Sequence, residues 1–388
     1  MQAWAWRAFA PARPRPGTTN GAPGERTGRG QAILYVLNDG SGTVTPILVA
    51  RRKAGKDISV GGTFPSAISV SPDGRTVYVA GQRAVIPIMT GGSVPGRPIS
   101  VSGRPGAIAF TPDGKTAWLL SGASKAVPIN VASGRAGKPV TVATADDGAG
   151  EIAITRSGRT AFFAGDFHLV PLDLATSKAA HPIRYGGNQG AFAFSGRVEP
   201  GRGDTVWATV SGWPDVLRVT SGSRISVRRT RLVSSARQIA VTPNGRTVFV
   251  STAQGVVPID AASGRPGRLI RIRNLANDLA VAPDGRTLYV AAGRAIVPVA
   301  VATGKPGRAL GIARPHYRVR ALAISPDGTT LWASWERLSG SGAGFVTPVS
   351  TPRMRAGAAI RVGSDPSCIV LAVPSATRPA DPASCTLG

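Results

Sequence analysis

A short turn-like hexapeptide returns about every forty residues along this chain. It reads SPDGRT from Ser71, TPDGKT from Thr111, TRSGRT from Thr155, TPNGRT from Thr242, APDGRT from Ala282 and SPDGTT from Ser325, and a degenerate copy, GRGDT, ends at Thr205. Counted between their threonines, successive copies are 40 to 45 residues apart. A fixed period of this length indicates one supersecondary unit repeated along the chain, and it constrains the fold more than any other feature.

An aromatic residue follows the threonine of every copy by two positions. The column comprises Tyr78, Trp118, Phe162, Trp207, Phe249, Tyr289 and Trp332, with Tyr35 in the segment ILYVL as an eighth member. Aromatic side chains carry a large apolar area. We therefore expect this column to pack between adjacent repeats as core.

Each repeat reads as four short strands joined by turns. In the unit around Ser71, the first strand is AISV and the second is TVYVA. Between them, Pro72 presets the first turn dihedral and Gly74 takes the left-handed position. A third strand with a VxPI pattern follows, and a second glycine-rich turn leads to the fourth. Helical periodicity is absent throughout.

A proline recurs inside the expected third strand. The column comprises Pro46, Pro87, Pro128, Pro171, Pro258, Pro298 and Pro348. Proline cannot donate a ladder hydrogen bond, so it belongs at a strand start or a bulge. The sequence by itself gives no reason for its regular use here.

Four-stranded units of this length predict an all-β fold, a β-propeller of four-stranded antiparallel blades. Seven complete units lie between a partial unit at Tyr35 and a lone strand, CIVLAV, from Cys368. If that last strand joins the N-terminal blade, the ring closes with eight blades and leaves no open edge. Seven blades with one irregular segment outside the ring is the alternative.

Composition divides the chain into three parts. Residues 1–30 are rich in Pro, Gly and Arg and are expected to be a disordered leader. Residues 31–374 form the propeller, and residues 375–388 form a C-terminal tail. The first residues do not make a convincing signal peptide, because their apolar run is short and is broken by Arg7. No stretch reaches the length needed to span a bilayer.

The turn followed by Tyr-Val and the valine-rich third strand resemble the repeats of the YVTN family of bacterial β-propellers. The resemblance covers roughly residues 31–374 and implies the propeller fold, while it leaves the function open. Many repeats of that family end the third strand with Ile-Asp, and here only Asp173 and Asp260 match this position. A role resting on that aspartate is therefore not expected in most blades.

The formal net charge is +26, from 46 Lys and Arg against 20 Asp and Glu. In an up-and-down blade, the first–second and third–fourth turns lie on the same face. These turns carry basic residues, so we expect a basic face comprising Arg75, Lys115, Arg135, Lys138, Arg246, Arg265, Arg268, Arg286, Lys305 and Arg308. Such a field attracts polyanions. The alternative is that exposed turns need charge for solubility.

The loops on the opposite face contain acidic and aromatic residues within irregular units. The candidate ligand-binding residues are Asp166, His168, Trp213, Asp215, Asp278, His316, Tyr317, Trp335 and Glu336. We expect an acidic and aromatic patch there, in contrast to the basic face. For each residue, a solvated loop side chain is the alternative.

The chain has two cysteines, Cys368 and Cys385. A disulfide between them would pin the tail to the ring, stabilise the fold by about 3 kcal/mol and imply an oxidising compartment. Two unrelated thiols are the alternative. Two cysteines alone are too few for a zinc site, which needs about four ligands. We expect no metal and no cofactor.

Motifs for catalysis are scarce: HExxH, GxSxG and P-loop patterns are absent. We therefore favour a non-enzymatic, monomeric binding or scaffold protein that is extracellular or on the cell surface, with a cytoplasmic location as the alternative. Its basic face would contact an anionic polymer or membrane surface, and its variable face a protein or small ligand. Sequence-specific recognition of nucleic acid is not favoured, because no helix is available for a major groove.

The alternative function is a lactonase-like hydrolase or lyase with a site at the mouth of the channel. That function would require Asp166, His168, His316 and Glu336 to meet around one pocket.

Overall fold

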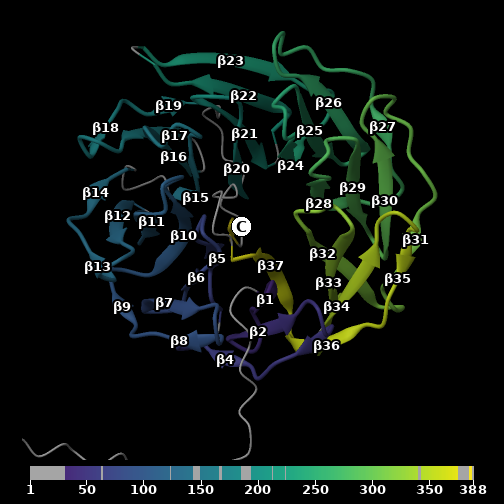
Figure 1. Ribbon diagram of the computed structural model, residues 1–388. Coiled ribbons are helices and arrows are strands. Elements are labelled where there is room, and N and C mark those ends of the chain that lie inside the picture. The colour runs from purple at the N-terminus through teal and green to yellow at the C-terminus, as the bar shows by residue number, and fades with distance from the viewer. Residues whose placement is uncertain are drawn as a thin grey trace, which may run out of the picture.

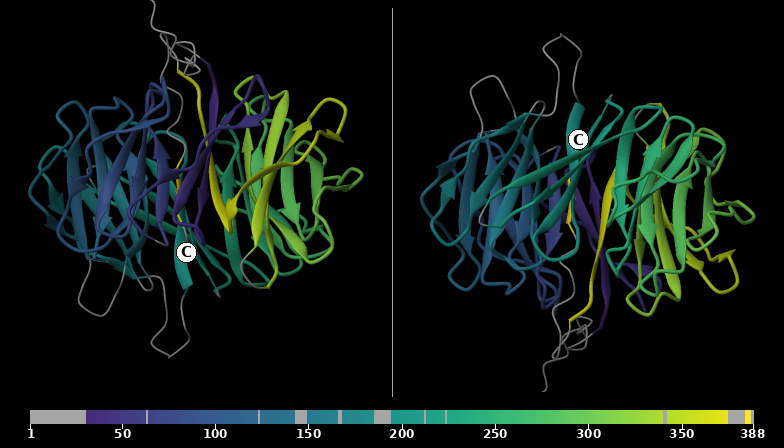
Figure 2. Two further views of the ribbon diagram at one scale, coloured as in Figure 1. Left: turned by 90° about the horizontal axis from the view of Figure 1, so that it is seen from below. Right: turned by 90° about the horizontal axis from the view of Figure 1, so that it is seen from above.

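The computed structural model describes residues 31–388 apart from 63, 123, 143–148, 166–167, 185–193, 212, 223, 340–341, 375–383 and 387–388. The described residues form eight β-sheets arranged in a ring around a central axis (Figure 1). The side views show the eight sheets standing side by side in one layer (Figure 2). The prediction of an eight-bladed, all-β propeller is confirmed. No helix able to cross a membrane occurs among the described residues.

We number the sheets as blades 1 to 8 in chain order, and each strand list runs from the innermost strand outward. Blade 1 contains β37 (Pro366–Ala372), β1 (Ile33–Asn38), β2 (Thr43–Leu48), β3 (Lys53–Ala54) and β4 (Ile58–Ser59). Blade 2 contains β5 (Ala67–Val70), β6 (Thr76–Ala80), β7 (Ala84–Met89), β8 (Val94–Pro95) and β9 (Ile99–Ser100). Blade 3 contains β10 (Pro105–Phe110), β11 (Thr116–Ser121), β12 (Lys125–Asn130), β13 (Arg135–Ala136) and β14 (Val140–Thr141). Blade 4 contains β15 (Ala149–Ile154), β16 (Thr160–Gly165), β17 (His168–Asp173), β18 (Lys178–Ala179) and β19 (Ile183–Arg184).

The second half of the ring follows the same plan. Blade 5 contains β20 (Phe194–Pro200), β21 (Thr205–Ser211), β22 (Asp215–Thr220) and β23 (Ser226–Arg231). Blade 6 contains β24 (Ala236–Val241), β25 (Thr247–Thr252), β26 (Gly255–Asp260) and β27 (Ile270–Arg271). Blade 7 contains β28 (Ala276–Val281), β29 (Thr287–Ala292), β30 (Ala295–Ala300) and β31 (Leu310–Gly311). Blade 8 contains β32 (Tyr317–Ile324), β33 (Thr330–Arg337), β34 (Ala343–Ser350), β35 (Arg355–Ala356) and β36 (Ile360–Ser364).

The ring is closed by a strand from the C-terminal end of the chain. Strand β37 pairs antiparallel with β1, placing Val370 opposite Tyr35 and Cys368 opposite Leu37. Blade 1 therefore takes its inner strand from one end of the propeller sequence and its other strands from the other end. This closure is the one predicted from the lone CIVLAV segment.

The aromatic column forms core. All eight members are at most 5 % exposed. They reach across the boundaries between blades, as where Tyr78 of blade 2 meets Phe110 of blade 3 with ring centroids 5.0 Å apart. The prediction that this column packs between repeats is confirmed.

The structure explains the proline column. In blade 3, Trp118 lies opposite Pro128, whose carbonyl oxygen faces the outer strand and accepts a 2.7 Å hydrogen bond from the nitrogen of Gly137. The outer strand is interrupted at this point, into β13 and β14, so no ladder acceptor is left facing the missing N–H of proline. The same bond, at 2.7–2.8 Å, is received by Pro46, Pro87, Pro171, Pro258, Pro298 and Pro348.

Blade 5 shows what happens without the proline. Arg218 lies opposite Trp207, where the other blades have proline. The outer strand β23 is continuous and pairs with β22 residue for residue, from Asp215 with Arg231 to Thr220 with Ser226. An uninterrupted outer strand therefore accompanies the residue that retains its N–H.

The end of the tail also has a defined backbone position. Residues 384–386 form a short strand, β38, which pairs antiparallel with β5, the inner strand of blade 2. It also contacts β10 and β37, the inner strands of blades 3 and 1, so it lies at the centre of the ring (Figure 1). Cys368 is buried and disulfide-bonded, and Cys385, the only other cysteine in the sequence, lies in β38 with its side chain outside the described residues.

Candidate functional sites

One face of the ring is built from the repeated hexapeptide turns, and we call it the turn face. In the first of them, the hydroxyl of Ser71 donates to the carboxylate of Asp73 at 2.6 Å, and Asp73 accepts a further bond from the nitrogen of Arg75. The nitrogen of Thr76 then donates back to the Ser71 hydroxyl at 3.0 Å. This network fixes the turn and directs the residue at position 75 outward. Gly74 has φ +68°, as the turn requires.

The ten predicted basic residues are all exposed. None of them takes part in an ion pair within the described ranges. Seven of them lie at the turn face, in or directly after its turns, with Arg135 as the first residue of β13: Arg75, Lys115, Arg135, Arg246, Arg265, Arg286 and Lys305.

The other three, Lys138, Arg268 and Arg308, lie on the outer rim and not in the turns, which corrects the prediction. They follow the glycine that bonds to the strand proline, so the break in the outer strand places them about halfway along the blade edge. Blades 3, 6 and 7 thus each carry one basic residue in the turn and another on the rim.

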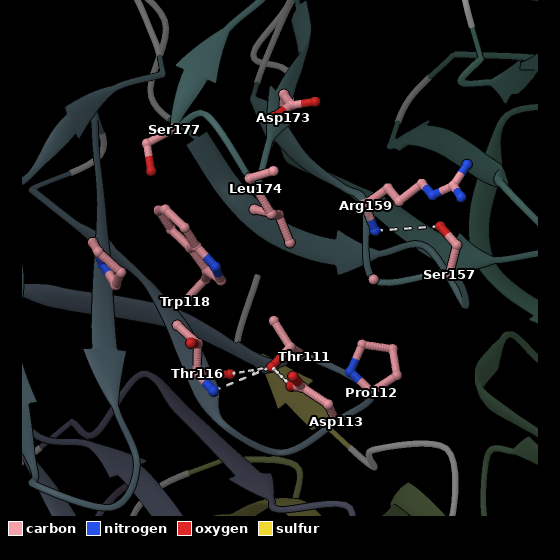
Figure 3. Close-up of a pocket in the computed structure, with 13 residues that line it drawn as sticks. Thr111, Pro112, Asp113, Thr116, Trp118, Ser157, Arg159, Asp173, Leu174 and Ser177 are labelled. Atoms are coloured by element: carbon pink, nitrogen blue, oxygen red, sulfur yellow. Dashed lines mark hydrogen bonds between the residues drawn. The ribbon is translucent and has the colours of Figure 1, made fainter.

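An inter-blade cleft of about 830 Å³ opens between blades 3 and 4 at the turn face (Figure 3). Trp118 lies in its wall, and Arg159 and Ser157 belong to the turn on the blade 4 side. The two carboxylates in the cleft each accept hydrogen bonds from their own turn. Asp113 accepts one from the Thr111 hydroxyl at 2.6 Å, and Asp173 accepts two from the nitrogen and the hydroxyl of Thr176, both at 2.7 Å. The Thr111 hydroxyl lowers the pKa of Asp113, and the Thr176 N–H lowers the pKa of Asp173.

The opposite face, which we call the loop face, brings together only some of its predicted residues. Tyr317, Trp335 and Glu336 meet in blade 8, and His316, exposed with φ +66°, directly precedes Tyr317. Asp166 lies outside the described residues. His168 begins β17 of blade 4, on the opposite side of the ring from blade 8 (Figure 1). The described members of the set required for a hydrolase or lyase therefore do not converge.

The remaining predicted residues connect parts of the fold. The carboxylate of Asp278 accepts the nitrogen of Leu279 at 2.9 Å and that of Leu322, in the next blade, at 2.7 Å. Trp213 is half-buried and packs against the core between blades 4 and 5. Asp215 is buried, with one carboxylate oxygen 3.6 Å from Arg229.

Blade 8 projects further than its neighbours at the loop face. Its three inner strands have eight residues each, where those of blade 7 have six. In this extension Trp335 stacks on Phe345 with centroids 4.4 Å apart, and Tyr317 meets Trp335 edge-on at 5.1 Å. The Trp335 indole donates to the Thr347 hydroxyl at 2.9 Å, and the guanidinium of Arg314 lies 5.2 Å from the Phe345 centroid. The cluster is thus a packed aromatic unit with one cation at its rim.

Glu336 lies beside this unit and forms ion pairs with two arginines. Arg318 approaches one carboxylate oxygen at 2.6 and 2.8 Å, and Arg320 lies 3.9 Å from the same oxygen. Two guanidinium nitrogens of Arg318 thus share a single carboxylate oxygen in a charge-assisted contact. The expected contrast between an acidic loop face and a basic turn face is therefore wrong in part: arginines accompany the carboxylates here, and exposed Arg83 and Arg294, in loops, and Lys125, at the start of β12, also lie at this face.

Two further carboxylates meet where blade 8 passes into blade 1. The backbone nitrogen of Asp39 donates to the carbonyl of Asp365 at 3.0 Å. Burial raises the pKa of both side chains; the negative charges of Asp365 and Glu336 raise that of Asp39 further, and Glu336 raises that of Asp365. No group of three His, Cys, Asp or Glu residues suited to a metal ion occurs in the part of the chain that the structure describes.

Sequence reasoning missed Arg314, Arg318, Arg320, Phe345, Asp39 and Asp365. One signal was available for blade 8: sixteen residues separate Trp332 from Pro348, against nine between Tyr289 and Pro298. That excess length predicts a projecting hairpin. The meeting of Asp39 with Asp365 depends on ring closure and has no local signal.

Comparisons with known proteins support the fold. No family model matches the chain, and no curated protein matches it in sequence. The apo structure of AztD from Citrobacter koseri is similar with a TM-score of 0.64 and 14% identity, covering 88% of this chain and 98% of that one. A functionally unknown protein from Desulfotomaculum acetoxidans gives 0.58 and 13%, covering 88% and 99%, and hydrazine synthase from Kuenenia stuttgartiensis gives 0.53 and 18%, covering 79% and 99%. At these identities the similarities show the β-propeller class alone.

Proposed function

We propose that this chain is a YVTN-type propeller that acts as a non-enzymatic binding scaffold for an anionic polymer. The observation that carries the proposal is the set of ten exposed basic side chains at repeated positions of the turn face and outer rim, free of ion pairs in the described chain. Spread around a rigid ring, such charges make many weak contacts at once, and a field of this kind raises the local concentration of polyanions.

Two pairs of basic residues, one on blade 3 and one on blade 7, are the strongest candidates for binding the polymer. Arg135 with Lys138, and Lys305 with Arg308, each place one charge at the turn and one on the rim. The third strands of these blades end in Asn130 and Ala300, so neither turn has the Asp that blades 4 and 6 have there. These two segments therefore combine two cations each with no carboxylate in the same turn.

The site of action that we propose is extracellular or at the cell surface, with the protein as a monomer. The disulfide at Cys368 supports this part of the proposal, because structural disulfides persist in oxidising compartments.

The test is a titration with polyphosphate and with heparin over a salt series. One variant changes Arg135, Lys138, Lys305 and Arg308 to Gln. The matched control changes four other basic residues to Gln: Arg83, Lys125, Arg273 and Arg294. These residues are exposed but belong neither to the turn face nor to the three rim residues. Both variants therefore have the same net charge. We expect at least a tenfold loss of affinity for the first variant at about 0.15 M salt, a weaker dependence on salt, and little change for the control.

Equal losses in the two variants would show that net charge alone drives binding and would overturn the assignment to this surface. Binding that is unchanged between low and high salt would overturn the electrostatic mechanism itself. Vesicles containing anionic lipid, run in parallel, distinguish a membrane surface from a polymer.

A further inference from the structure

Strand β23 on the outer edge of blade 5 differs from every other outer strand that the structure describes. It is six residues long and unbroken, whereas the outer strands of the other blades are two-residue segments. The exception is blade 8, where β36 has five residues but follows a break after β35. In Figure 1, β23 runs along the rim of the ring with its partner β22 on the inner side.

The cause is Arg218 in the place of proline. Its guanidinium lies 6.0 Å from the Trp207 ring centroid and donates to the carbonyl of Ala262, in the next blade, at 2.9 Å. Arg218 thus lies next to the aromatic residue of its blade, as the proline does in the other blades. Unlike proline, it keeps its backbone N–H. Because it pairs with Arg228, the ladder continues across the point at which the other outer strands break.

The pairing leaves alternate backbone groups pointing outward. Arg228 pairs with Arg218, Thr230 with Val216, and the nitrogen of Leu232 donates to the carbonyl of Pro214 at 2.7 Å. Backbone groups on the same side of an antiparallel strand alternate along it. The N–H and C=O groups of Val227, Arg229 and Arg231 therefore face away from β22, and no strand pairs with them among the described residues.

The side chains of this edge are positively charged and exposed. Arg228, Arg229 and Arg231 are exposed, as is Val227 between them and the strand start. Arg229 has one carboxylate within reach, Asp215 at 3.6 Å, and Arg228 and Arg231 form no ion pair in the described chain. A row of free backbone groups flanked by cations complements an extended chain that carries carboxylates.

We propose that β23 binds an extended acidic peptide as a fifth strand of blade 5. Main-chain hydrogen bonds to Val227, Arg229 and Arg231 would supply the register, as in other cases of strand addition to a sheet edge. Carboxylates at alternate peptide positions would lie beside Arg229 and Arg231, two residues apart on the same face of the strand. This surface includes none of the ten basic residues that carry the proposed function, so either proposal can fail without the other.

The test uses the full chain and a fluorescent peptide with alternating Glu and Thr, measured by polarisation. The first variant is Val227→Pro, which removes one outward N–H without touching the arginines or the ladder to β22. Its matched control, Val227→Thr, keeps the N–H. We expect at least a tenfold loss of affinity for V227P and less than a twofold change for V227T.

A second arm keeps the protein unchanged. Methylating alternate backbone nitrogens of the peptide removes its hydrogen bonds while keeping its charge, so we expect binding to fall at least tenfold. This arm decides the question even if V227P fails to fold. Equal binding of the methylated and unmethylated peptides would show charge attraction alone and overturn the proposal. Self-association of the protein through β23 with no peptide binding would overturn it too.

Discussion

The carbonyl oxygen of Pro128 accepts a 2.7 Å hydrogen bond from the nitrogen of Gly137, and the proline ring leaves little room for a side chain at position 137. A Cβ atom built on Gly137 would lie 3.1 Å from Cγ of the proline ring. The same approach, 3.1–3.2 Å, occurs at Gly55, Gly96, Gly267, Gly307 and Gly357. The proline ring therefore explains why six of the seven residues that make this hydrogen bond are glycine.

This relationship predicts a graded response at position 137. Gly137→Val should lower the free energy of unfolding by about 1–3 kcal/mol, because the branched side chain must displace the proline ring or the outer strand. Gly137→Ala should have a smaller effect, since blade 4 has Ala180 at this position with its hydrogen bond at 2.8 Å. Urea denaturation measures both.

The control for this prediction is a double-mutant cycle. In a Pro128→Ala background the effect of Gly137→Val should shrink, because the ring it meets has gone. An undiminished effect there would show that the loss comes from the backbone and not from the proline.

A second prediction concerns the link between blades 7 and 8. Asp278→Ala removes the acceptor for the nitrogen of Leu322, a buried residue, and should destabilise the protein by about 1–3 kcal/mol. Asp284→Ala, at an exposed turn of the same blade, is the control and should change stability by less than about 0.5 kcal/mol. Similar effects of the two substitutions in chemical denaturation would contradict the role assigned to Asp278.

The repeat explains why much of the fold could be predicted from the sequence. The turn, the aromatic two residues after its threonine, and the closing strand are local patterns, each fixed by backbone dihedrals or by the period of two along a strand. The position of Lys138 could not be predicted, because it depends on a strand break that Pro128 induces in its neighbour. In blade 5 the outer strand is unbroken because Arg218 stands where the other blades have proline. The effect of that difference becomes clear only when the strand pairing is known.

The loop face was harder to predict for a related reason. Tyr317, Trp335 and Phe345 come from three different strands, and their meeting depends on the register of the extended hairpin. The contact between Asp39 and Asp365 joins opposite ends of the propeller sequence. Such pairs are set by how the ring closes, and no local pattern records them.

A third prediction follows from the buried hydroxyl of Tyr35. It lies 3.0 Å from the hydroxyl of Ser93 in the adjacent blade, and burial raises its pKa to about 12. At neutral pH, Tyr35→Phe should cost about 0.5–1.5 kcal/mol through the lost hydrogen bond. As the pH rises above about 10, the unfolded tyrosine releases its proton while the folded one keeps it, so the wild type loses stability that the phenylalanine variant does not lose.

The difference between wild type and Tyr35→Phe should therefore shrink between about pH 10 and 12, and denaturation at several pH values tests this. Ser93→Ala is the matched control: it removes the same hydrogen bond but keeps the phenol, so its deficit should persist across the range. A constant difference between wild type and Tyr35→Phe at every pH would show that the phenol titrates alike in both states.

A fourth prediction concerns Asp365, whose pKa burial and the charge of Glu336 raise above the ordinary value. A carboxyl with a raised folded pKa binds its proton more tightly in the folded state, so stability falls as pH rises from the unfolded value of about 3.9 through the folded value. At pH 7 Asp365 is ionised, so the wild type has lost all of the stability that this carboxyl can lose. Asp365→Asn removes that loss, and asparagine also suits the left-handed backbone at this position, with φ +53°.

We therefore expect Asp365→Asn to stabilise the protein at pH 7 by a few tenths to about 1 kcal/mol, a range kept small because the side chain is partly exposed and screened by solvent. At about pH 3 the electrostatic part of the gain should vanish, leaving only the backbone contribution. Asp113→Asn is the opposite control: the pKa of Asp113 is lowered by the Thr111 hydroxyl, so its stabilising charge is present at pH 7 and is lost as pH falls through the folded pKa. Chemical denaturation of both variants at the two pH values tests this. At pH 7, the changes in the free energy of unfolding should have opposite signs. If Asp365→Asn stabilises the protein equally at pH 3 and pH 7, the gain comes from the backbone alone.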